Sequence, residues 1–142
     1  HYRLKRQEYL NRHRFRPEEN KIFTLSVTQL QPSQLYISRG KLRNVREWFN
    51  ISDRSNFDPI PIKELDGRFV MTDGHTRAVA AHLAGWNEIP VYYETDELDI
   101  AAYTIDVKWC DEAGIHSPYD LTTRIVSHKD YERLWRKRCM EF

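Results

Sequence analysis

The feature that most constrains the fold is a run of short apolar segments, separated by turn residues, in the middle of the chain. Its parts are strand-like segments at 59–65, 68–72 and 89–94 and an Ala-rich, helix-like segment at 77–83. Asp66-Gly67 joins the first two strands and is a dipeptide that strongly favours a two-residue β-hairpin. Gly85 is placed to end the helix in a left-handed conformation. A hairpin, a helix and a returning strand so close together predict an α+β fold, a small mixed β-sheet with flanking helices.

Further elements are predicted on both sides of this segment. We expect a strand at 22–27 and helices at 2–13, 39–49, 97–112 and 128–140. Ser38 and Ser127 stand where they can cap the second and the last of these helices. The expected apolar faces are Leu42, Val45, Trp48 and Phe49 in the helix at 39–49, and Leu98, Ala101, Ala102, Ile105, Val107 and Trp109 in the helix at 97–112. Pro59 and Pro61 suit either an edge strand or the start of a strand.

The length of 142 residues fits one domain. We divide it into a core at 22–94, a basic N-terminal helix at 1–16 and a C-terminal helical extension at 97–142. Cys110 and Cys139 lack the spacing of a disulfide framework or a zinc ribbon and are expected to be buried thiols. No apolar run approaches the roughly 20 residues of a membrane helix, and no signal-peptide pattern opens the chain. We therefore expect no membrane partner and a cytoplasmic location.

Positive charge is concentrated near the N-terminus, although the formal net charge of the chain is only +1. The excess is carried by Arg3, Lys5, Arg6, Arg12, Arg14 and Arg16, against the single acid Glu8. In the same stretch Tyr2, Tyr9 and Phe15 provide rings on which bases can stack. Two interpretations stay open: a segment that binds nucleic acid, or the solvated face of a helix whose apolar side packs on the core.

The turn between the second strand and the Ala-rich helix has the composition of a phosphate-binding site. A helix N-terminus presents unpaired backbone N–H groups and the positive end of the helix dipole. Gly74 allows a tight turn, and His75, Thr76 and Arg77 add a ring N–H, a hydroxyl and a guanidinium. Asp73, at the strand end, can hold Mg²⁺ or accept a proton from an attacking hydroxyl. An ordinary strand-to-helix turn, with Arg77 in solvent, is equally compatible with this composition.

Residues 59–93 resemble the core of the ParB/sulfiredoxin superfamily. The shared pattern is an apolar strand, a hairpin, a second strand, a Gly-x-x-Arg turn, an Ala-rich helix, a glycine and an Ile-Pro-Val strand. Residues 22–49 fit the N-terminal part of that pattern loosely, and residues 95–142 match no part of it. The resemblance implies a ParB/sulfiredoxin-like sheet with flanking helices and the binding of nucleotide phosphates at Gly74, His75, Thr76 and Arg77. Because this fold supports several chemistries, the activity depends on the site residues.

The branches of the superfamily differ at this turn. Sulfiredoxins place a nucleophilic cysteine there, whereas residues 73–77 contain no thiol. ParB partition proteins carry Gly-Glu-Arg-Arg and continue into a helix-turn-helix domain, for which residues 95–142 leave little room. Free-serine kinases carry Asp-Gly-His-His-Arg, which is similar to the Asp-Gly-His-Thr-Arg of this chain. In those kinases a glutamate before the first core helix recognises or activates serine, and Ser38 or Arg39 stands in its place here.

The sequence supports three hypotheses. In the first, the protein binds ATP, ADP or CTP with Mg²⁺ at residues 73–77 and transfers phosphate to a small hydroxyl acceptor such as free serine, as a kinase or NTPase. Asp73 and His75 would then be catalytic, and Asp73 would also be the metal ligand. In the second, it is a nucleic-acid-binding module without catalysis that uses residues 1–16; in the third, a degenerate member that only binds a ligand or partner. Additional substrate or loop contacts are expected from Ser38, Arg39, His116, Thr122 and Arg124.

Several other catalytic classes are excluded by the absence of their motifs. None of the six histidines stands four residues from another, which argues against a structural zinc site. The chain has no Gly-x-Ser-x-Gly elbow and no Walker-type loop, so serine-hydrolase and P-loop chemistry are not expected.

Overall fold

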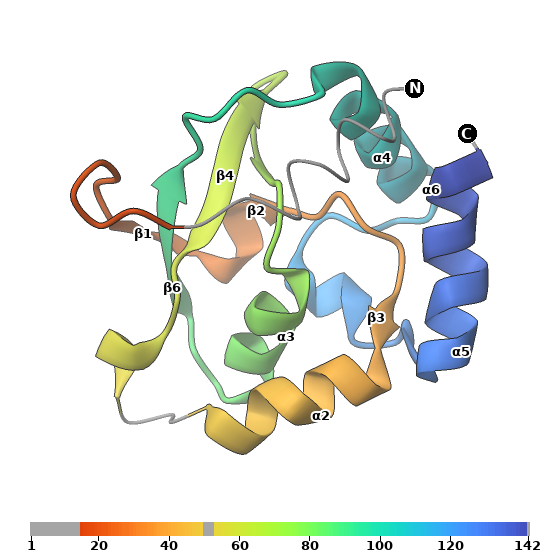
Figure 1. Ribbon diagram of the computed structural model, residues 1–142, viewed down its shortest axis with the longest axis horizontal. Coiled ribbons are helices and arrows are strands. Elements are labelled where there is room, and N and C mark those ends of the chain that lie inside the picture. The colour runs from red at the N-terminus through yellow and green to blue at the C-terminus, as the bar shows by residue number, and fades with distance from the viewer. Residues whose placement is uncertain (1–14, 50–52, 142) are drawn as a thin grey trace.

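The computed structural model describes residues 15–49 and 53–141 (Figure 1). A five-stranded sheet has the strand order β1 (Phe23–Ser26), β6 (Glu88–Tyr93), β4 (Ile60–Leu65), β5 (Arg68–Met71) and β2 (Leu30–Gln31). The pairs β1–β6 and β4–β5 are antiparallel, and the pairs β4–β6 and β5–β2 are parallel. This confirms the α+β class and the mixed sheet; the helix expected at 2–13 lies outside the described residues.

In Figure 1 the helices lie below and to the right of the sheet, and they continue to the C-terminal end of the described chain. They are α2 (Arg39–Trp48), α3 (His75–Leu83), α4 (Ile100–Glu112), α5 (His128–Tyr131) and α6 (Lys137–Glu141), with short turns η1 (Val27–Gln29), η2 (Arg54–Asn56) and η3 (Pro118–Leu121). A π-helical segment, η4 (Glu132–Arg136), joins α5 to α6, so the predicted last helix forms one rod (Figure 1). Ser38 and Ser127 cap α2 and α5 as expected, accepting bonds from the amides of Lys41 and Asp130. Within the described chain no helix has both the length and the apolar character needed to span a bilayer.

A second, two-stranded sheet joins the C-terminal extension to the core. It pairs β3 (Ile37–Ser38) in parallel with β7 (Ile125–Val126). Sequence analysis missed β3, β7 and β2 as strands, because two residues are too short to show an alternating pattern. The pairing places the residues before α2 directly beside the residues before α5.

Strand β4 lies in the middle of the sheet, although Pro61 is its second residue. The prolines therefore mark the start of a strand and not a sheet edge. The carbonyl of Pro61 accepts a hydrogen bond from the Thr72 amide at 3.0 Å, but proline has no N–H to return to the Thr72 carbonyl. The hydroxyl of the fully buried Tyr103, on α4, donates to that carbonyl at 2.9 Å. A side chain thus replaces the missing backbone donor at the end of β5.

The predicted turns of the central segment are confirmed by their backbone angles. Asp66 and Gly67 both have positive φ, 50° and 76°, as a two-residue hairpin turn requires. Gly85, with φ of 87°, ends α3: its amide bonds the His82 carbonyl, and the Trp86 amide bonds the Ala81 carbonyl. Backbone bonds therefore end helix α3 at Gly85.

Helix α3 lies between two apolar clusters, which explains its many alanines. Ala78 and Ala81 pack with the sheet, while Val79 and Ala80 pack with α2, α4 and the C-terminal rod. The predicted face of α2 is confirmed for Leu42, Val45 and Phe49 and is wrong for Trp48, whereas the predicted face of α4 is mostly wrong. Trp48 is 50% exposed, and α4 buries Ala102, Tyr103, Asp106 and Cys110 in place of most of the expected residues. Polar side chains occupy the inward positions of α4, so its apolar residues did not mark the buried face.

Both cysteines are buried free thiols, as predicted. Burial raises the pKa of Cys110 to about 12, so that the reactive thiolate is scarce at neutral pH. We expect a Cys139→Ser variant, which keeps only Cys110, to react with a disulfide reagent such as dithiobis(nitrobenzoate) very slowly at pH 8. The same variant in denaturant should react at the rate of an ordinary thiol. Equal rates in the two states would contradict the burial of Cys110.

Candidate functional site

A pocket of about 350 Å³ opens at the N-terminal end of α3. It is lined by Gln34, Lys41, Asn44, Val45, Asp73, Gly74, His75, Thr76, Arg77 and Tyr131. The five residues of the predicted phosphate-binding turn therefore lie together at one pocket. The opposite wall comes from α2 and from the end of α5. The turn alone did not indicate this opposite wall.

The turn into α3 leaves backbone amides available to a ligand. Gly74 is the N-cap residue, with φ of 78°, and no side chain caps the helix. The first hydrogen bond of the helix runs from the Ala78 amide to the Gly74 carbonyl at 3.0 Å. The amides of Thr76 and Arg77 precede this bond and have no acceptor within the helix. The first turn of α3 contains no acid, so no side chain within that turn offsets the positive end of the helix dipole.

Arg77 folds back over Gly74 instead of extending into solvent. Its Nε donates to the Asp58 carbonyl at 3.2 Å, and its Nη2 donates to the Pro59 carbonyl at 3.4 Å. A Cβ on Gly74 would lie only 2.8 Å from that Nη2, which shows how closely the guanidinium covers the glycine. These two bonds use two of the five N–H donors of an arginine, and the donors on Nη1 remain for a ligand. The guanidinium is thereby held at the rim of the pocket.

Asp73 and Thr76 are the polar side chains of the turn that make no bond to the part of the chain that the structure describes. Neither side chain has a hydrogen bond or ion pair with any described residue. Both are partly exposed and line the pocket. A carboxylate and a hydroxyl that are both unpaired at a pocket wall can bind a ligand without breaking an existing contact.

His75 serves the structure of the turn. Its ring is 3% exposed, and its Nε2 accepts a hydrogen bond from the Ser33 amide at 2.9 Å. The Ser33 hydroxyl in turn donates to the Met71 carbonyl at 2.6 Å. The ring therefore ties the loop before β3 to the end of β5 and to the start of α3. Because this bond occupies its Nε2, His75 is a positioning residue for the turn.

Lys41 is the principal site residue that sequence analysis missed. It reaches the pocket from α2, with its Nζ 4.9 Å from the centre of the Tyr131 ring. Partial burial and the nearby positive charge of Arg136 lower the pKa of Lys41, while Glu132 and Asp73 oppose the shift. The sequence contains no local signal for this role, because Lys41 and the turn come from separate elements. The packing of α2 on α3 brings them together.

The additional contacts predicted for the site lie elsewhere. Ser38 is 1% exposed; its hydroxyl caps α2 and contacts Nδ1 of His128 at 2.9 Å. Arg124 bonds the Leu35 carbonyl, and Thr122 bonds the Tyr119 carbonyl, both at 2.6 Å. Neither His116, whose ring lies 3.6 Å from Asp111, nor Arg39 lines the pocket. Of these five residues the structure brings none to the turn at 73–77.

Of the predicted nucleic-acid residues, Arg3, Lys5, Arg6, Arg12 and Arg14 lie outside the described part of the chain. Arg16 is described, and its guanidinium forms an ion pair with Asp96 at 3.1 Å. This contact also raises the pKa of Arg16. Arg16 therefore already has an acidic partner, and binding by residues 1–16 stays a prediction.

Mg²⁺ fits this pocket only together with a phosphate ligand. Among the residues that the structure describes, no group of three or more His, Cys, Asp or Glu side chains is arranged to hold a metal ion. Asp73 is the one carboxylate that lines the pocket. Mg²⁺ is commonly held by one or two carboxylates plus the phosphates of a substrate, and a single aspartate satisfies that requirement.

No family model and no curated protein matches this sequence. Among solved structures, the chain is similar to protein Atu1540 from Agrobacterium tumefaciens, with a TM-score of 0.50 and 10% sequence identity. The similarity covers 72% of this chain and 62% of that protein, so the chain spans less than two thirds of it. At this identity the comparison supports the fold alone.

Proposed function

We propose that the protein binds the phosphate groups of a nucleotide, ADP, ATP or CTP with Mg²⁺, in the pocket at the start of α3. The observation that carries this proposal is the excess of positive groups in the pocket. The free amides of α3, the guanidinium of Arg77 and the ammonium of Lys41 gather there, with Asp73 as the one acid. A bound anion would neutralise these charges and satisfy the free donors. The resemblance of residues 59–93 to the ParB/sulfiredoxin superfamily supports the same assignment.

Each residue has a distinct role in this proposal. The amides of Thr76 and Arg77 and the Nη1 of Arg77 donate to phosphate oxygens, and Lys41 pairs with the phosphate from the α2 side. Asp73 would hold Mg²⁺, which when bound neutralises phosphate charge and orients the nucleotide. His75 holds the turn in place through Ser33.

Transfer of the phosphate to a small hydroxyl acceptor such as free serine is a further step of the proposal. Such a step needs a base near the acceptor, and Asp73 is the carboxylate that the pocket offers. Asp73 is also the proposed metal ligand. Nucleotide binding, which needs Asp73 only as that ligand, and phosphate transfer, which needs it as a base, are therefore separate claims. Incubation with ATP or ADP and serine, with phosphoserine as the product measured, tests the transfer without affecting the binding claim.

The pH dependence of binding tests the role of Lys41. A bound phosphate favours the charged form of Lys41 and therefore raises its pKa above that of the free protein, so binding takes up protons. We expect the affinity for Mg-ADP, measured by calorimetry, to fall as the pH rises through the lowered pKa of free Lys41. The Lys41→Arg variant stays charged and should lose this dependence.

Lys108→Ala is the matched control, since this exposed lysine on α4 lies outside the pocket. It should bind Mg-ADP with the affinity and the pH dependence of the unmodified protein. If none of ADP, ATP and CTP binds the unmodified protein with Mg²⁺, the proposed function is wrong. If binding occurs with no dependence on Lys41, the nucleotide lies elsewhere.

A further inference from the structure

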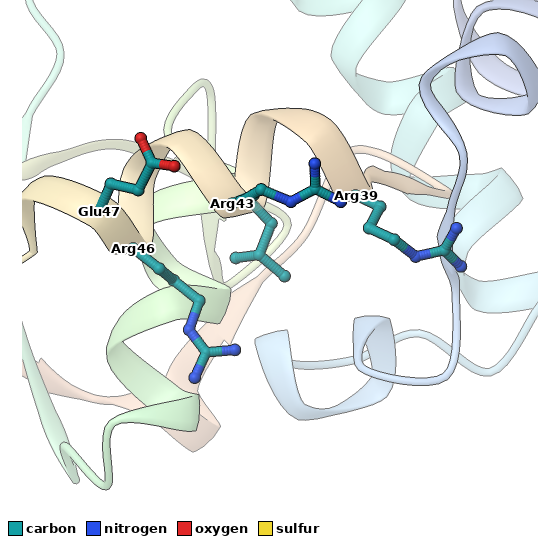
Figure 2. Close-up of a pocket in the computed structure, with 5 residues that line it drawn as sticks. Arg39, Arg43, Arg46 and Glu47 are labelled. Atoms are coloured by element: carbon teal, nitrogen blue, oxygen red, sulfur yellow. The ribbon is translucent and has the colours of Figure 1, made fainter.

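Helix α2 carries a second group of cations on the side turned away from the phosphate pocket. Arg39, Arg43 and Arg46 line a separate groove of about 450 Å³, together with Leu42 and Glu47. We call these three residues the arginine row. Their spacing of four and three residues places them on one face of a helix, along about 10 Å of its axis. Figure 2 shows them following one another along α2, with Glu47 directed to the opposite side from Arg46.

No acid among the described residues forms an ion pair with the arginine row. Arg43 and Arg46 form no hydrogen bond or ion pair with the described residues, and Arg39 makes one long bond, 3.4 Å, to the Ile125 carbonyl. All three side chains are exposed. The C-terminal rod also carries several cations, but it differs from the arginine row in the ion pairs that its cations form. Three of its five cations are paired with acids one turn away: Arg133 with Asp130, Arg136 with Glu132, and Lys137 with Glu141.

From this contrast we infer that the arginine row binds the phosphate backbone of a single-stranded nucleic acid. Guanidinium groups present planar pairs of N–H donors that match phosphate oxygens, and a row of them can contact consecutive phosphates of one strand. Leu42 gives the groove an apolar residue beneath the charges.

An exposed aromatic ring on a turn that packs against α3, the neighbour of α2, favours a nucleic acid over an acidic peptide. Turn η3 packs on α3, which packs on α2, and it carries Tyr119, whose side chain is 63% exposed. The ring of Tyr119 meets His82 of α3 edge-on, with ring centres 5.5 Å apart. In Figure 2 the guanidinium of Arg46 is directed toward the side of α2 on which α3 lies. The exposed ring of Tyr119 provides a stacking surface for an unpaired base of a strand that runs from the arginine row across α3.

The test is fluorescence anisotropy with labelled 20-nucleotide oligo-dT and oligo-U, over a series of salt concentrations. We expect the triple variant R39Q/R43Q/R46Q to bind at least about tenfold more weakly than the unmodified protein at low salt. The slope of log K against log salt should become shallower by about 2, since each lost phosphate contact contributes about 0.7 on a single strand. The variant R133Q/R136Q/K137Q removes the same net charge from the C-terminal rod and should bind almost as the unmodified protein does.

Several outcomes of the assay with the variants and the comparison ligands would overturn the inference. One is an equal loss of affinity in the two triple variants. Another is tighter binding of a 20-base-pair duplex or of polyglutamate than of the single strands. A further one is binding that depends on Arg3, Lys5, Arg6, Arg12 and Arg14 but not on the arginine row.

Saturating Mg-ADP serves as a competitor in the same assay. Continued oligonucleotide binding in its presence supports a site distinct from the nucleotide pocket, whereas displacement would place both ligands in that pocket and contradict the inference. Failure of Mg-ADP to bind at all would refute the proposed function alone.

Discussion

Replacing Gly74 by alanine should destabilise the protein by about 2–5 kcal/mol and abolish nucleotide binding. Two effects add. The residue has φ of 78°, where an L side chain costs about 1–2 kcal/mol. A Cβ would also lie 2.7 Å from Cδ1 of Ile60 and 2.8 Å from Nη2 of Arg77, so the buried Ile60 and the bonded Arg77 would both have to move. Thermal unfolding should show a fall in Tm of roughly 5–15 °C.

Gly85→Ala is the matched control for this prediction. Gly85 has a similar φ of 87°, but no atom lies within 4 Å of the position that its Cβ would occupy. The control should therefore show only the conformational cost of about 1–2 kcal/mol and should retain nucleotide binding. Equal destabilisation by the two substitutions would mean that close packing at Gly74 contributes nothing.

Replacing Arg77 by alanine should weaken the binding of Mg-ADP by about 10- to 150-fold. This range corresponds to the roughly 1.5–3 kcal/mol of one hydrogen bond to a charged group. The bonds that Arg77 makes to the carbonyls of Asp58 and Pro59 hold its guanidinium at the pocket before the ligand arrives. The effect should therefore appear in calorimetry as a loss of affinity in a protein that still unfolds cooperatively.

Arg77→Lys separates charge from geometry at this position. It keeps the positive charge but loses the planar pair of donors, and we expect it to recover only part of the lost affinity. Full affinity in Arg77→Ala, with the fold intact, would remove Arg77 from the proposed site.

The central segment of the fold could be predicted because its signals are local. Asp66-Gly67 defines the hairpin, Ser38 and Ser127 define two helix starts, and Gly85 defines a helix end. The short strands β3 and β7 could not be predicted, since each is held by a partner far away in the sequence. The orientation of α4 could not be predicted from the sequence either, because the buried side of this helix carries polar side chains. Tyr103, for example, faces inward to bond the Thr72 carbonyl opposite Pro61.

The same distinction explains the site. The turn at 73–77 could be identified because a strand end, a glycine and a helix start are consecutive in the sequence. Lys41 could not, because its place in the pocket depends on the packing of α2 on α3. The role of His75 could not be predicted either. A histidine suggests catalysis as a residue type, whereas the Nε2 of His75 accepts a hydrogen bond from the Ser33 amide and positions the turn. Ser38 and Arg39 were chosen because they stand where the similar kinases have a glutamate, and His116, Thr122 and Arg124 because their loop follows a long helix. Tertiary contacts place all five away from the turn.

The backbone amides at the start of α3 provide the most direct test of phosphate binding. In a ¹⁵N-resolved spectrum titrated with Mg-ADP, we expect the largest shifts at the amides of Thr76 and Arg77, with smaller shifts in α2 around Lys41. The same titration of the Arg77→Ala variant should require a proportionally higher ADP concentration. Saturable shifts centred on any other part of the molecule, with the amides of Thr76 and Arg77 unchanged, would contradict phosphate binding at this helix terminus.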